Sequence, residues 1–423
     1  MPVGDPNQIQ DVPGCLPVES AMDILRVETI AGFDRREWDA LVGENVFSSH
    51  AWLRTLEETL IVPSRRTYFA VRDSFGLVAA AACYVQEPGE PSLSLDDFLF
   101  GRFSSVARFL RLQTLPALMC GARFGVSDPI FVRDGMEATQ RQRLAAGLLQ
   151  AMEDDARKNH WSLCIRGLPD APTPCAPVFS RRRYLPIRQP PTALLTIEWD
   201  SFEQYRQHLK QSHKHAEDCL RKEMNRAKRT GVAIRELDDP APHQTQLHQL
   251  LDAHYRRLNG QPLLFKPEFF TRLKANLGEC AVVYVATVEG RLIGALVGLR
   301  SRDTMYLPLV GIDPERTRNN AAYFNLTFHY PIQDAIERRY RRIYYGSMLY
   351  QMKARRGCRL MDMHHYFRGR NTIQEAVLRP LFRYHSKRLD RETASLPRDR
   401  HPSPPGADGT HHTTAVSGVR WSS

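Results

Sequence analysis

An order of helices and strands that occurs twice is the strongest constraint on the fold of this chain. In the second half, apolar residues at helical spacing predict two helices, and three apolar strands follow them, with a Glu289-Gly290 turn between the first two. A long helix and one more short strand complete this order. The predicted elements span residues 247–255, 267–277, 281–287, 292–299, 304–310, 319–339 and 342–345.

The first half repeats part of this order. Trp38, Trp52 and their apolar neighbours recur at helical spacing, and Ser49 can cap the second of two helices. Two strands joined by a Gly76 turn come next, and a helix and a strand follow after an irregular middle at 88–131. These elements are predicted at 68–72, 77–85, 140–159 and 161–165. We therefore predict an α+β fold of two tandem units, each a mixed, mostly antiparallel sheet flanked by helices.

The two ends of the chain have a different composition. Residues 1–22 are rich in Pro, Gly and Asp, and the residues from Arg398 onward hold almost no aliphatic side chains. A segment with so little to bury does not offset the conformational entropy that folding removes. We therefore expect a disordered leader over 1–22 and a disordered tail over 389–423, with one unit at 23–200 and the other at 201–388.

Charge and apolar patterning limit the class of protein. The chain has 58 Lys and Arg against 47 Asp and Glu, a formal net charge of +11 that favours anionic partners such as nucleic acid or the phosphates of coenzyme A. No apolar run reaches the ~20 residues that cross a bilayer, and the N-terminus has no secretory pattern. The 8 cysteines are scattered without a CxxC pair. We expect a cytoplasmic protein with no membrane span, no metal and no permanently bound cofactor; the sequence does not indicate an oligomeric state.

A basic segment at 201–231 lies between the two units. Ser201 and Gln204 fit a capping box and Gly231 is a typical C-terminal stop, so one helix is predicted here. Its cations far outnumber its acidic residues, and such a surface can follow a phosphate backbone or can simply be a solvated helix face. No aromatic residues interleave the cations, which counts against stacking on single-stranded nucleic acid.

A second cationic segment lies between the strand that ends at Val310 and the long helix. Arg316 and Arg318 come just before Asn319 and Ala321. The first N–H groups of a helix have no backbone partner and attract anions, and an Asn at this place can cap the helix. A phosphate-binding helix start is therefore predicted here.

The spacing Arg316-x-x-Asn319-x-Ala321 resembles the Q/R-x-x-G-x-G/A acyl-CoA loop of the GNAT acyltransferase superfamily, with Asn319 in place of a glycine. The wider order of segments resembles the FemAB-type acyltransferases, and among them the bacterial peptidoglycan biosynthesis/recognition N-acyltransferases. The likeness covers about residues 24–388. It rests on the tandem units, on FSSHAWLRTLE at 47–57, on the basic helix, and on AIERRYRRIYYG followed by SMLYQMKARRGCR.

This resemblance implies an enzyme that uses an acyl-CoA or an aminoacyl-tRNA as donor co-substrate. It places Lys353 where FemAB-like enzymes carry a functional lysine, and a charge there can stabilise the oxyanion or bind a donor phosphate. Tyr350 near the same strand end can return a proton to the leaving group, as GNAT tyrosines do. Each also has a structural interpretation, Lys353 as an exposed cation and Tyr350 as a core aromatic. The candidate donor-binding residues are Arg316, Arg318, Asn319, Ala321 and Arg356.

Two functions follow from these observations. The first is an N-acyltransferase that acts on an amine of a cell-wall precursor, a peptide or a secondary metabolite. The second is a non-catalytic nucleic-acid-binding protein that uses the basic helix 201–231, although the sequence has no helix-turn-helix, zinc-finger or RNP signature. Hydrolases and P-loop enzymes have no support, because the G-x-S-x-G and G-x-x-x-x-G-K-[ST] motifs do not occur.

Overall fold

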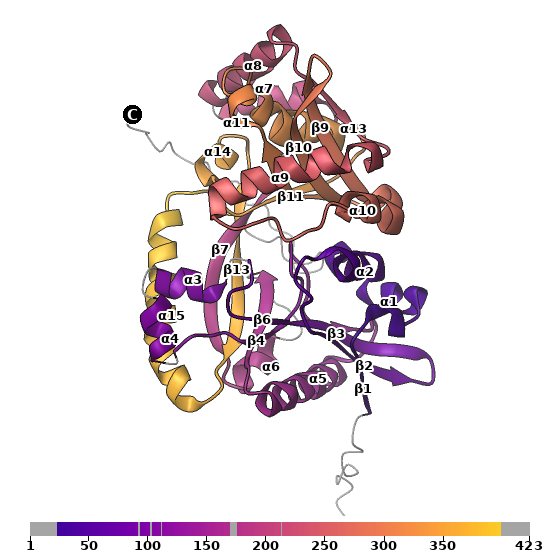
Figure 1. The fold of residues 1–423 in the computed structure, drawn as a ribbon, viewed down its shortest axis with the longest axis vertical. Coiled ribbons are helices and arrows are strands. Elements are labelled where there is room, and N and C mark those ends of the chain that lie inside the picture. The colour runs from indigo at the N-terminus through magenta and orange to yellow at the C-terminus, as the bar shows by residue number, and fades with distance from the viewer. Residues whose placement is uncertain are drawn as a thin grey trace, which may run out of the picture.

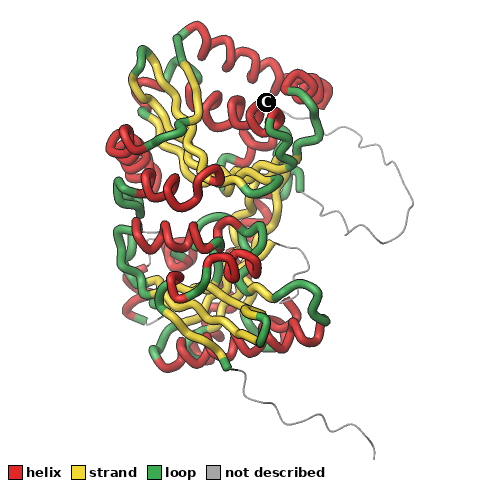
Figure 2. Tube along the Cα trace, turned by 90° about the vertical axis from the view of Figure 1, so that its right-hand side faces the viewer, coloured by secondary structure: helices red, strands yellow, loops and turns green. Residues whose placement is uncertain are grey.

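The computed structural model describes residues 23–91, 94–101, 104–110, 112–169, 176–212 and 214–398; the expected leader at 1–22 and residues 399–423 of the expected tail lie outside these ranges. One mixed sheet runs through the whole molecule, from the lower half to the upper half of Figure 1. Figure 2 shows the same sheet after a 90° turn, with helices packed along it in both halves. Among the described residues, no helix is long and apolar enough to span a bilayer.

We call residues 24–196 the first unit and residues 202–393 the second unit. The strands of the first unit are β1 (Ile24–Val27), β2 (Arg66–Asp73), β3 (Gly76–Gln86), β4 (Ala117–Cys120), β5 (Phe131–Val132), β6 (Ser162–Pro169) and β7 (Leu185–Thr196). Its helices are α1 (Arg35–Val42), α2 (His50–Thr59), α3 (Leu95–Phe100), α4 (Ser104–Phe109), α5 (Ala138–Lys158) and α6 (Ala176–Arg181). Short 3-10 turns lie at Ile30–Gly32 and Val46–Ser48.

The second unit opens with two helices before its first strand. Its strands are β8 (Ala233–Glu236), β9 (Ala281–Val288), β10 (Arg291–Arg300), β11 (Thr304–Ile312), β12 (Arg342–Gly346) and β13 (Arg359–Arg368). Its helices are α7 (Phe202–Ser212), α8 (Lys214–Arg229), α9 (Gln244–Asn259), α10 (Phe269–Leu277), α11 (Pro314–Thr317), α12 (Ala322–Phe324), α13 (Tyr330–Glu337), α14 (Tyr350–Ala354) and α15 (Thr372–Thr393). 3-10 turns lie at Ala241–His243 and Gly278–Cys280, and Asn325–His329 form a π-helical turn, η6.

The sheet has the same strand order from each of its outer edges. The order is β1-β2-β3-β4-β6-β13-β7-β12-β11-β10-β9-β8, so β1 corresponds to β8, β4 to β11 and β6 to β12. The last strands are exchanged: β13 of the second unit lies beside β6, and β7 of the first unit lies beside β12. In Figure 1 these two long strands join the halves of the molecule. Among the strand pairs of the described residues, only β4–β6 and β11–β12 are parallel, which confirms the predicted α+β class with a mixed, mostly antiparallel sheet.

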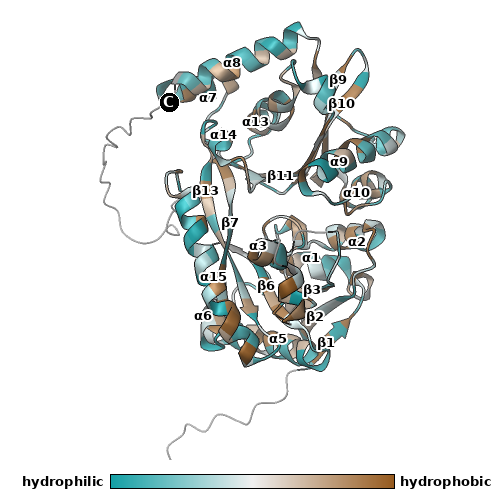
Figure 3. Ribbon diagram, turned by 60° about the vertical axis from the view of Figure 1, so that its left-hand side comes forward, coloured by the Kyte–Doolittle hydropathy of each residue, from teal (hydrophilic) through white to brown (hydrophobic). Residues whose placement is uncertain are grey.

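The basic segment at 201–231 forms two helices rather than the one expected. α7 buries Tyr205 and Leu209, and α8 buries Ala216, Leu220 and Ala227, so each helix turns an apolar face toward the core. A single helix of this length would extend for about 45 Å and leave part of that apolar surface in water. The exposed faces of α8 and α15 are mostly hydrophilic (Figure 3).

Two other boundaries differ from the expectations. The helix expected from Asn319 starts at Ala322, after Ala321 in a left-handed conformation with φ 58°. The disordered tail was expected from residue 389, and this start is wrong. α15 continues to Thr393, and both Leu389 and Leu396 are buried. The apolar residues are few there, but they fall where the helix faces the protein.

An aromatic cluster joins the two units. The rings of Phe265 and Phe269 stack with centroids 4.0 Å apart on the second unit. Trp52 of α2 packs edge-on against Phe269, and Phe47 packs edge-on against Tyr306 at 5.1 Å. The main-chain bridge between Leu60 and Phe265 lies at the same contact. Burial of several large aromatic side chains fixes how the two units sit against each other.

Candidate active site between the two units

Both parallel strand pairs end at the same place in the middle of the molecule. β11 pairs with β12 only over Thr304–Tyr306 and Arg342–Tyr344, and β4 pairs with β6 over Ala117–Cys120 and Ser162–Ile165. Beyond these segments the two strands of each pair no longer bond to each other. A cleft of about 400 Å³ lies there, between the units.

The cleft is lined by residues of both units. The first unit contributes Phe47, Tyr84, Gln86, Arg123, Phe124, Gly125, Val126, Arg166 and Thr192, and the second contributes Tyr255, Leu264, Tyr306, Leu307, Pro308, Leu309, Tyr344, Tyr345, Gly346 and Ser347. Apolar and aromatic side chains predominate, and a few polar groups lie among them. This composition and volume are typical of a small-molecule site.

Arg166 brings a positive charge to the first-unit wall. It is the first residue of β6 beyond the segment paired with β4, and its Nη1 atom donates a hydrogen bond to the Tyr84 hydroxyl. Its Nε atom is buried and has no hydrogen-bond partner among the described residues. The guanidinium of Arg123 lies over the Tyr84 ring at 4.7 Å, but Arg123 is neutralised by Glu90 at 2.7 Å.

His365 of β13 lies beside this charge and does not offset it. Its Nδ1 atom accepts a hydrogen bond from the backbone N–H of Gly167 at 3.1 Å, so the ring is held next to the end of β6. Burial, reinforced by the charge of Arg166, lowers the pKa of His365 to about 3. The imidazole is therefore neutral at physiological pH.

Lys353 lies behind the second-unit wall, and it is buried with 6% of its surface exposed. Its ammonium group donates three hydrogen bonds, to the carbonyl oxygens of Tyr345 at 2.8 Å, Gly346 at 3.0 Å and Ser347 at 2.9 Å. An ammonium has three N–H donors, so all of them are used. Burial lowers the pKa of Lys353 to about 8. Lys353 therefore holds the main chain of three residues that line the cleft.

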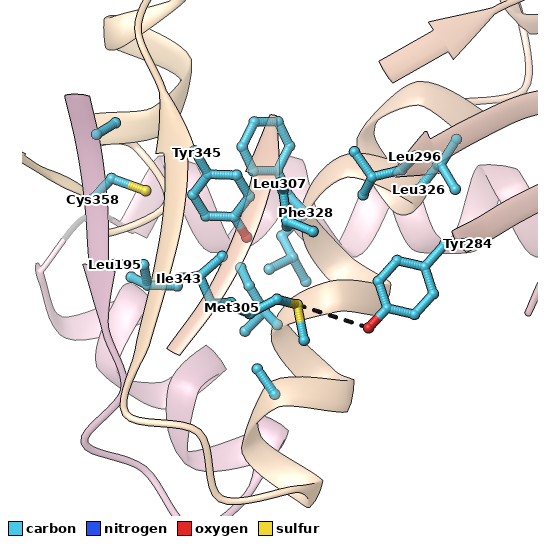
Figure 4. Close-up of a cluster of buried hydrophobic side chains, with 14 of the residues drawn as sticks. Leu195, Tyr284, Leu296, Met305, Leu307, Leu326, Phe328, Ile343, Tyr345 and Cys358 are labelled. Atoms are coloured by element: carbon cyan, nitrogen blue, oxygen red, sulfur yellow. Dashed lines mark hydrogen bonds between the residues drawn. The ribbon is translucent and has the colours of Figure 1, made fainter. Parts of the chain in front are cut away.

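The tyrosines near the same strand end have well-defined partners. The Tyr350 hydroxyl donates to the carbonyl of Pro191 at 2.9 Å, so it ties α14 to β7, and burial raises the pKa of Tyr350 to about 12. The side chain of Tyr345 points into the core of the second unit and packs against Phe328 with ring centroids 5.1 Å apart (Figure 4). Tyr350 therefore ties α14 to β7, and the ring of Tyr345 is part of the core of the second unit.

Arg356 belongs to a buried ion pair with α8. Its guanidinium contacts both carboxylate oxygens of Glu223, at 3.1 and 2.9 Å, and lies over the Phe328 ring at 4.4 Å. His329 of η6 bonds to the same carboxylate at 2.7 Å. Burial acts to raise the pKa of Glu223, but the His329 hydrogen bond and the charge of Arg356 outweigh it, and the net effect is a lowered pKa. Arg356 is therefore engaged within the protein.

The Arg316 segment lies at a different hollow, of about 580 Å³, beside α9. Arg316 lines it and pairs with Asp313 at 3.2 Å, and both Arg318 and Asn319 are exposed. The side chain that accepts from the first N–H of the helix, that of Ala322, is Asn320 at 3.0 Å, and this corrects the expected capping role of Asn319.

The structure brings only some of the predicted residues together. The residues whose carbonyls Lys353 holds line the cleft between the units, whereas Tyr350 is not among its lining residues, Arg316 lines the other hollow and Arg356 pairs with Glu223. Neither Arg318, Asn319 nor Ala321 is among the residues that line the cleft. Their role as donor ligands stays a prediction.

Sequence reasoning missed Arg166. The signal that could have found it is the repeat itself, because Arg166-Gly167 directly follow the residues of β6 that pair with β4, as Tyr345-Gly346 directly follow the residues of β12 that pair with β11. Gly167 and Gly346 both have positive φ, 71° and 67°, at these matching places. Tyr84 and Thr192 come from β3 and β7 and carry no comparable signal.

Comparisons with known proteins show which family model matches this chain and which solved structures share its fold. A family model described as FemAB-like, peptidoglycan biosynthesis/recognition, matches residues 29–398. A comparison with curated proteins finds no match. Among solved structures, the C-terminal domain of a putative lysylphosphatidylglycerol synthetase from Agrobacterium fabrum has a TM-score of 0.52 at 10% identity, over 84% of this chain and 97% of that one. FemX has a TM-score of 0.52 at 11% identity, over 81% of this chain and 96% of that one. At such identities the structures show a shared fold.

Proposed function

This chain belongs to the FemAB-like family, and from that premise we propose that it is an N-acyltransferase whose reaction takes place in the cleft between its two units. The family and the fold point broadly to acyl or aminoacyl transfer. The donor we propose is an acyl-CoA or an aminoacyl-tRNA. The acceptor is an amine of a cell-wall precursor, a peptide or a secondary metabolite.

One observation carries this proposal: a single cleft lies where both parallel strand pairs end, with a charged side chain on one wall and a lysine-held main chain on the other. Acyl transfer to an amine needs two substrates held in line and donors aimed at the oxyanion of the tetrahedral intermediate. A cleft built from two units provides a wall for each substrate. The C–N bond forms as the C–S or C–O bond of the donor breaks, and the proton lost by the amine leaves with the thiol or hydroxyl.

Lys353 has a positioning role in this proposal. In a trans peptide the N–H points opposite to the C=O. Three successive carbonyls of this segment point toward the Lys353 ammonium, so the N–H groups of the same peptides point away from Lys353. Gly346 and Ser347 line the cleft on that side. We assign the Ser347 N–H as an oxyanion donor, held in place by Lys353.

The test is transfer from labelled acetyl-CoA and from labelled aminoacyl-tRNA to a pool of amines, with the purified full chain. Labelled product that depends on the cleft supports the proposal. For a cleft-lining variant, Thr192→Val keeps the volume of the side chain and removes its hydroxyl, and Thr287→Val is its matched control on β9, outside the cleft. No transfer from either class of donor to any amine contradicts the proposal.

The second candidate function, non-catalytic binding of nucleic acid, is supported by exposed cations on α8. Lys222, Arg226 and Lys228 are exposed, whereas Arg221 is paired with Asp218 at 3.1 Å. If this face binds tRNA, the logarithm of the affinity falls with the logarithm of salt concentration by roughly 0.7 to 0.9 for each phosphate neutralised. Tight, salt-dependent tRNA binding by a protein that transfers nothing favours the non-catalytic function.

A further inference from the structure

Arg166 is half-buried, and its partners differ from those of three arginines whose guanidinium groups are well buried. Arg300 contacts Glu236 and Asp334, both at 2.9 Å. Arg123 contacts Glu90 at 2.7 Å, and Arg356 contacts Glu223 at 2.9 Å. For Arg166 the partners within the described residues are the Tyr84 hydroxyl and, at 3.5 Å, the carbonyl of Arg123, and no carboxylate is among them. A guanidinium removed from water without a counter-ion is costly unless something else supplies the charge.

Among the residues that the structure describes, the groups around Arg166 leave its charge uncompensated. Glu90 is already paired with Arg123, the neighbouring thiol is Cys164 in the core, and His365 is a neutral imidazole. Arg166 lines the cleft, and so do Tyr84 and Thr192, each of which carries a hydroxyl. The wall therefore offers one net positive charge with polar groups beside it.

We propose that Arg166 binds a carboxylate of the acceptor, so that the acceptor is an amine that also carries a carboxylate, such as an amino acid or a peptide. The planar guanidinium matches a carboxylate in shape and can donate two parallel hydrogen bonds to it. The charge balance favours a monoanion, because one unpaired guanidinium does not neutralise a diphosphate. Tyr84 orients the guanidinium, since its hydroxyl bonds to Nη1 while Arg123 stacks on its ring.

In this arrangement one wall of the cleft binds the carboxylate of the acceptor, and the opposite wall carries the proposed oxyanion donor. The carboxylate lies on the first-unit wall at Arg166, while the main chain at Gly346 and Ser347 faces it from the second unit. Aromatic side chains between them, among them Tyr306 and Tyr344, can contact the apolar part of the acceptor. That the bound molecule is the acceptor of the reaction rests on the proposed function. The binding of a carboxylate by Arg166 can be measured without turnover.

The experiment measures binding to the full chain without any donor. Isothermal titration at constant ionic strength compares L-phenylalanine with L-phenylalaninamide and L-lysine with L-lysinamide, pairs that differ in the carboxylate, and inorganic phosphate is a further probe. We expect at least one acid to bind about tenfold or more tightly than its amide. Arg166→Met removes that difference and Arg166→Lys keeps part of it. Arg65→Met, a matched control that stacks on Trp161 outside the cleft, leaves it unchanged.

A second variant keeps the inference testable if Arg166→Met fails to fold. Tyr84→Phe retains the ring under Arg123 and removes the hydroxyl that bonds to Arg166, so we expect acids to bind about two- to fivefold more weakly and amides to bind as before. Acids and amides that bind alike, or that both fail to bind at 10 mM (roughly the weakest affinity of interest), overturn the inference. Phosphate that binds through Arg166 more tightly than every acid overturns the carboxylate assignment.

The two proposals fail in different ways. A protein that binds acids through Arg166 but transfers nothing contradicts the proposed function and leaves this inference intact. A protein that acylates amides as readily as the matching acids, with no effect of Arg166→Met on the acceptor KM, contradicts this inference and leaves the proposed function intact.

Discussion

The two units place different chemistry at the same point of the same strand order. β6 pairs in parallel with β4, and β12 pairs in parallel with β11. Just past the paired residues each strand has a glycine with positive φ, Gly167 or Gly346. Before that glycine the first unit has Arg166, which lines the cleft, and the second has Tyr345, whose ring is in the core. A repeated fold therefore gives a side-chain charge to one wall and exposed main chain to the other.

The difference follows from what lies behind each wall. In the second unit, α14 places Lys353 against the carbonyls of residues 345–347, and the exchanged strand β7 passes alongside. In the first unit, His365 on the exchanged strand β13 bonds to the N–H of Gly167. The second unit thus supports carbonyls from behind, and the first supports an N–H. We expect substitutions at equivalent places to differ accordingly.

Loss of Lys353 should produce the largest effect. Lys353→Met leaves three carbonyls without their shared donor, so we expect transfer to fall by about a hundredfold, the usual cost of losing one oxyanion donor. Stability should fall by about 2 kcal/mol, because acceptors that are wholly or partly buried lose their partner. Initial rates, measured at a temperature where circular dichroism shows a folded protein, test the first expectation, and urea unfolding tests the second.

Arg355→Met is the matched control for this prediction, since Arg355 is exposed and lies in the same short segment as Lys353. It should keep both the rate and the stability. A folded Lys353→Met protein with the wild-type rate would remove the second-unit wall from the mechanism. The walls would then no longer differ in the way described.

The pH dependence of transfer should show a smaller effect of the same residue. Burial lowers the pKa of Lys353 to about 8, so above that pH the ammonium loses its charge and one of its three donors. The rate constant kcat should therefore fall as pH rises, by about tenfold per unit well above pH 8. In Lys353→Arg the guanidinium stays charged and this decline should disappear. A wild-type kcat that keeps rising to about pH 9.5 would contradict the assignment.

Alanine substitutions of Gly167 and Gly346, which occupy equivalent places, allow the two units to be compared directly. Both positions have positive φ and room for a methyl group, since nothing lies within 4 Å of a Cβ at Gly346 and only the Ser127 carbonyl lies at 4.0 Å from one at Gly167. Gly167→Ala and Gly346→Ala should each cost about 1–2 kcal/mol of folding free energy in urea unfolding. Transfer should suffer several times more in Gly346→Ala, because the main chain there is the proposed donor. Equal losses of activity would mean that the walls act alike.

The repeat in the sequence predicted the α+β class, three of the seven described strands of the first unit and four of the six described strands of the second. These were accessible because apolar period and turn glycines are local signals. Strand exchange could not be predicted, since β7 and β13 pair through backbone groups that every residue has. The irregular middle concealed β4, only four residues long, whose neighbours supply its register. The tail was set too early because two leucines, Leu389 and Leu396, are enough to fix the end of α15.

The candidate site was predicted less well, for a related reason. Lys353 was selected by resemblance, and its buried contact with three carbonyls depends on a turn between β12 and α14 that no local pattern encodes. Arg166 looked like an ordinary strand residue, because the feature that distinguishes it is the lack of a carboxylate among its described neighbours. Such a property belongs to the tertiary structure, and only folding reveals it.

Arg316 gives the smallest expected effect and tests whether the second unit uses its other hollow. Its side chain is half exposed and paired with Asp313, and exposed ion pairs contribute little, so Arg316→Ala should leave stability within ~0.5 kcal/mol. If the donor phosphates reach this hollow, the donor KM should rise about two- to fivefold while kcat changes little. Arg318→Ala, two residues further along the chain and also exposed, should show a smaller rise. A donor KM that neither substitution changes would confine donor recognition to the cleft, and the two walls there would have to bind both substrates.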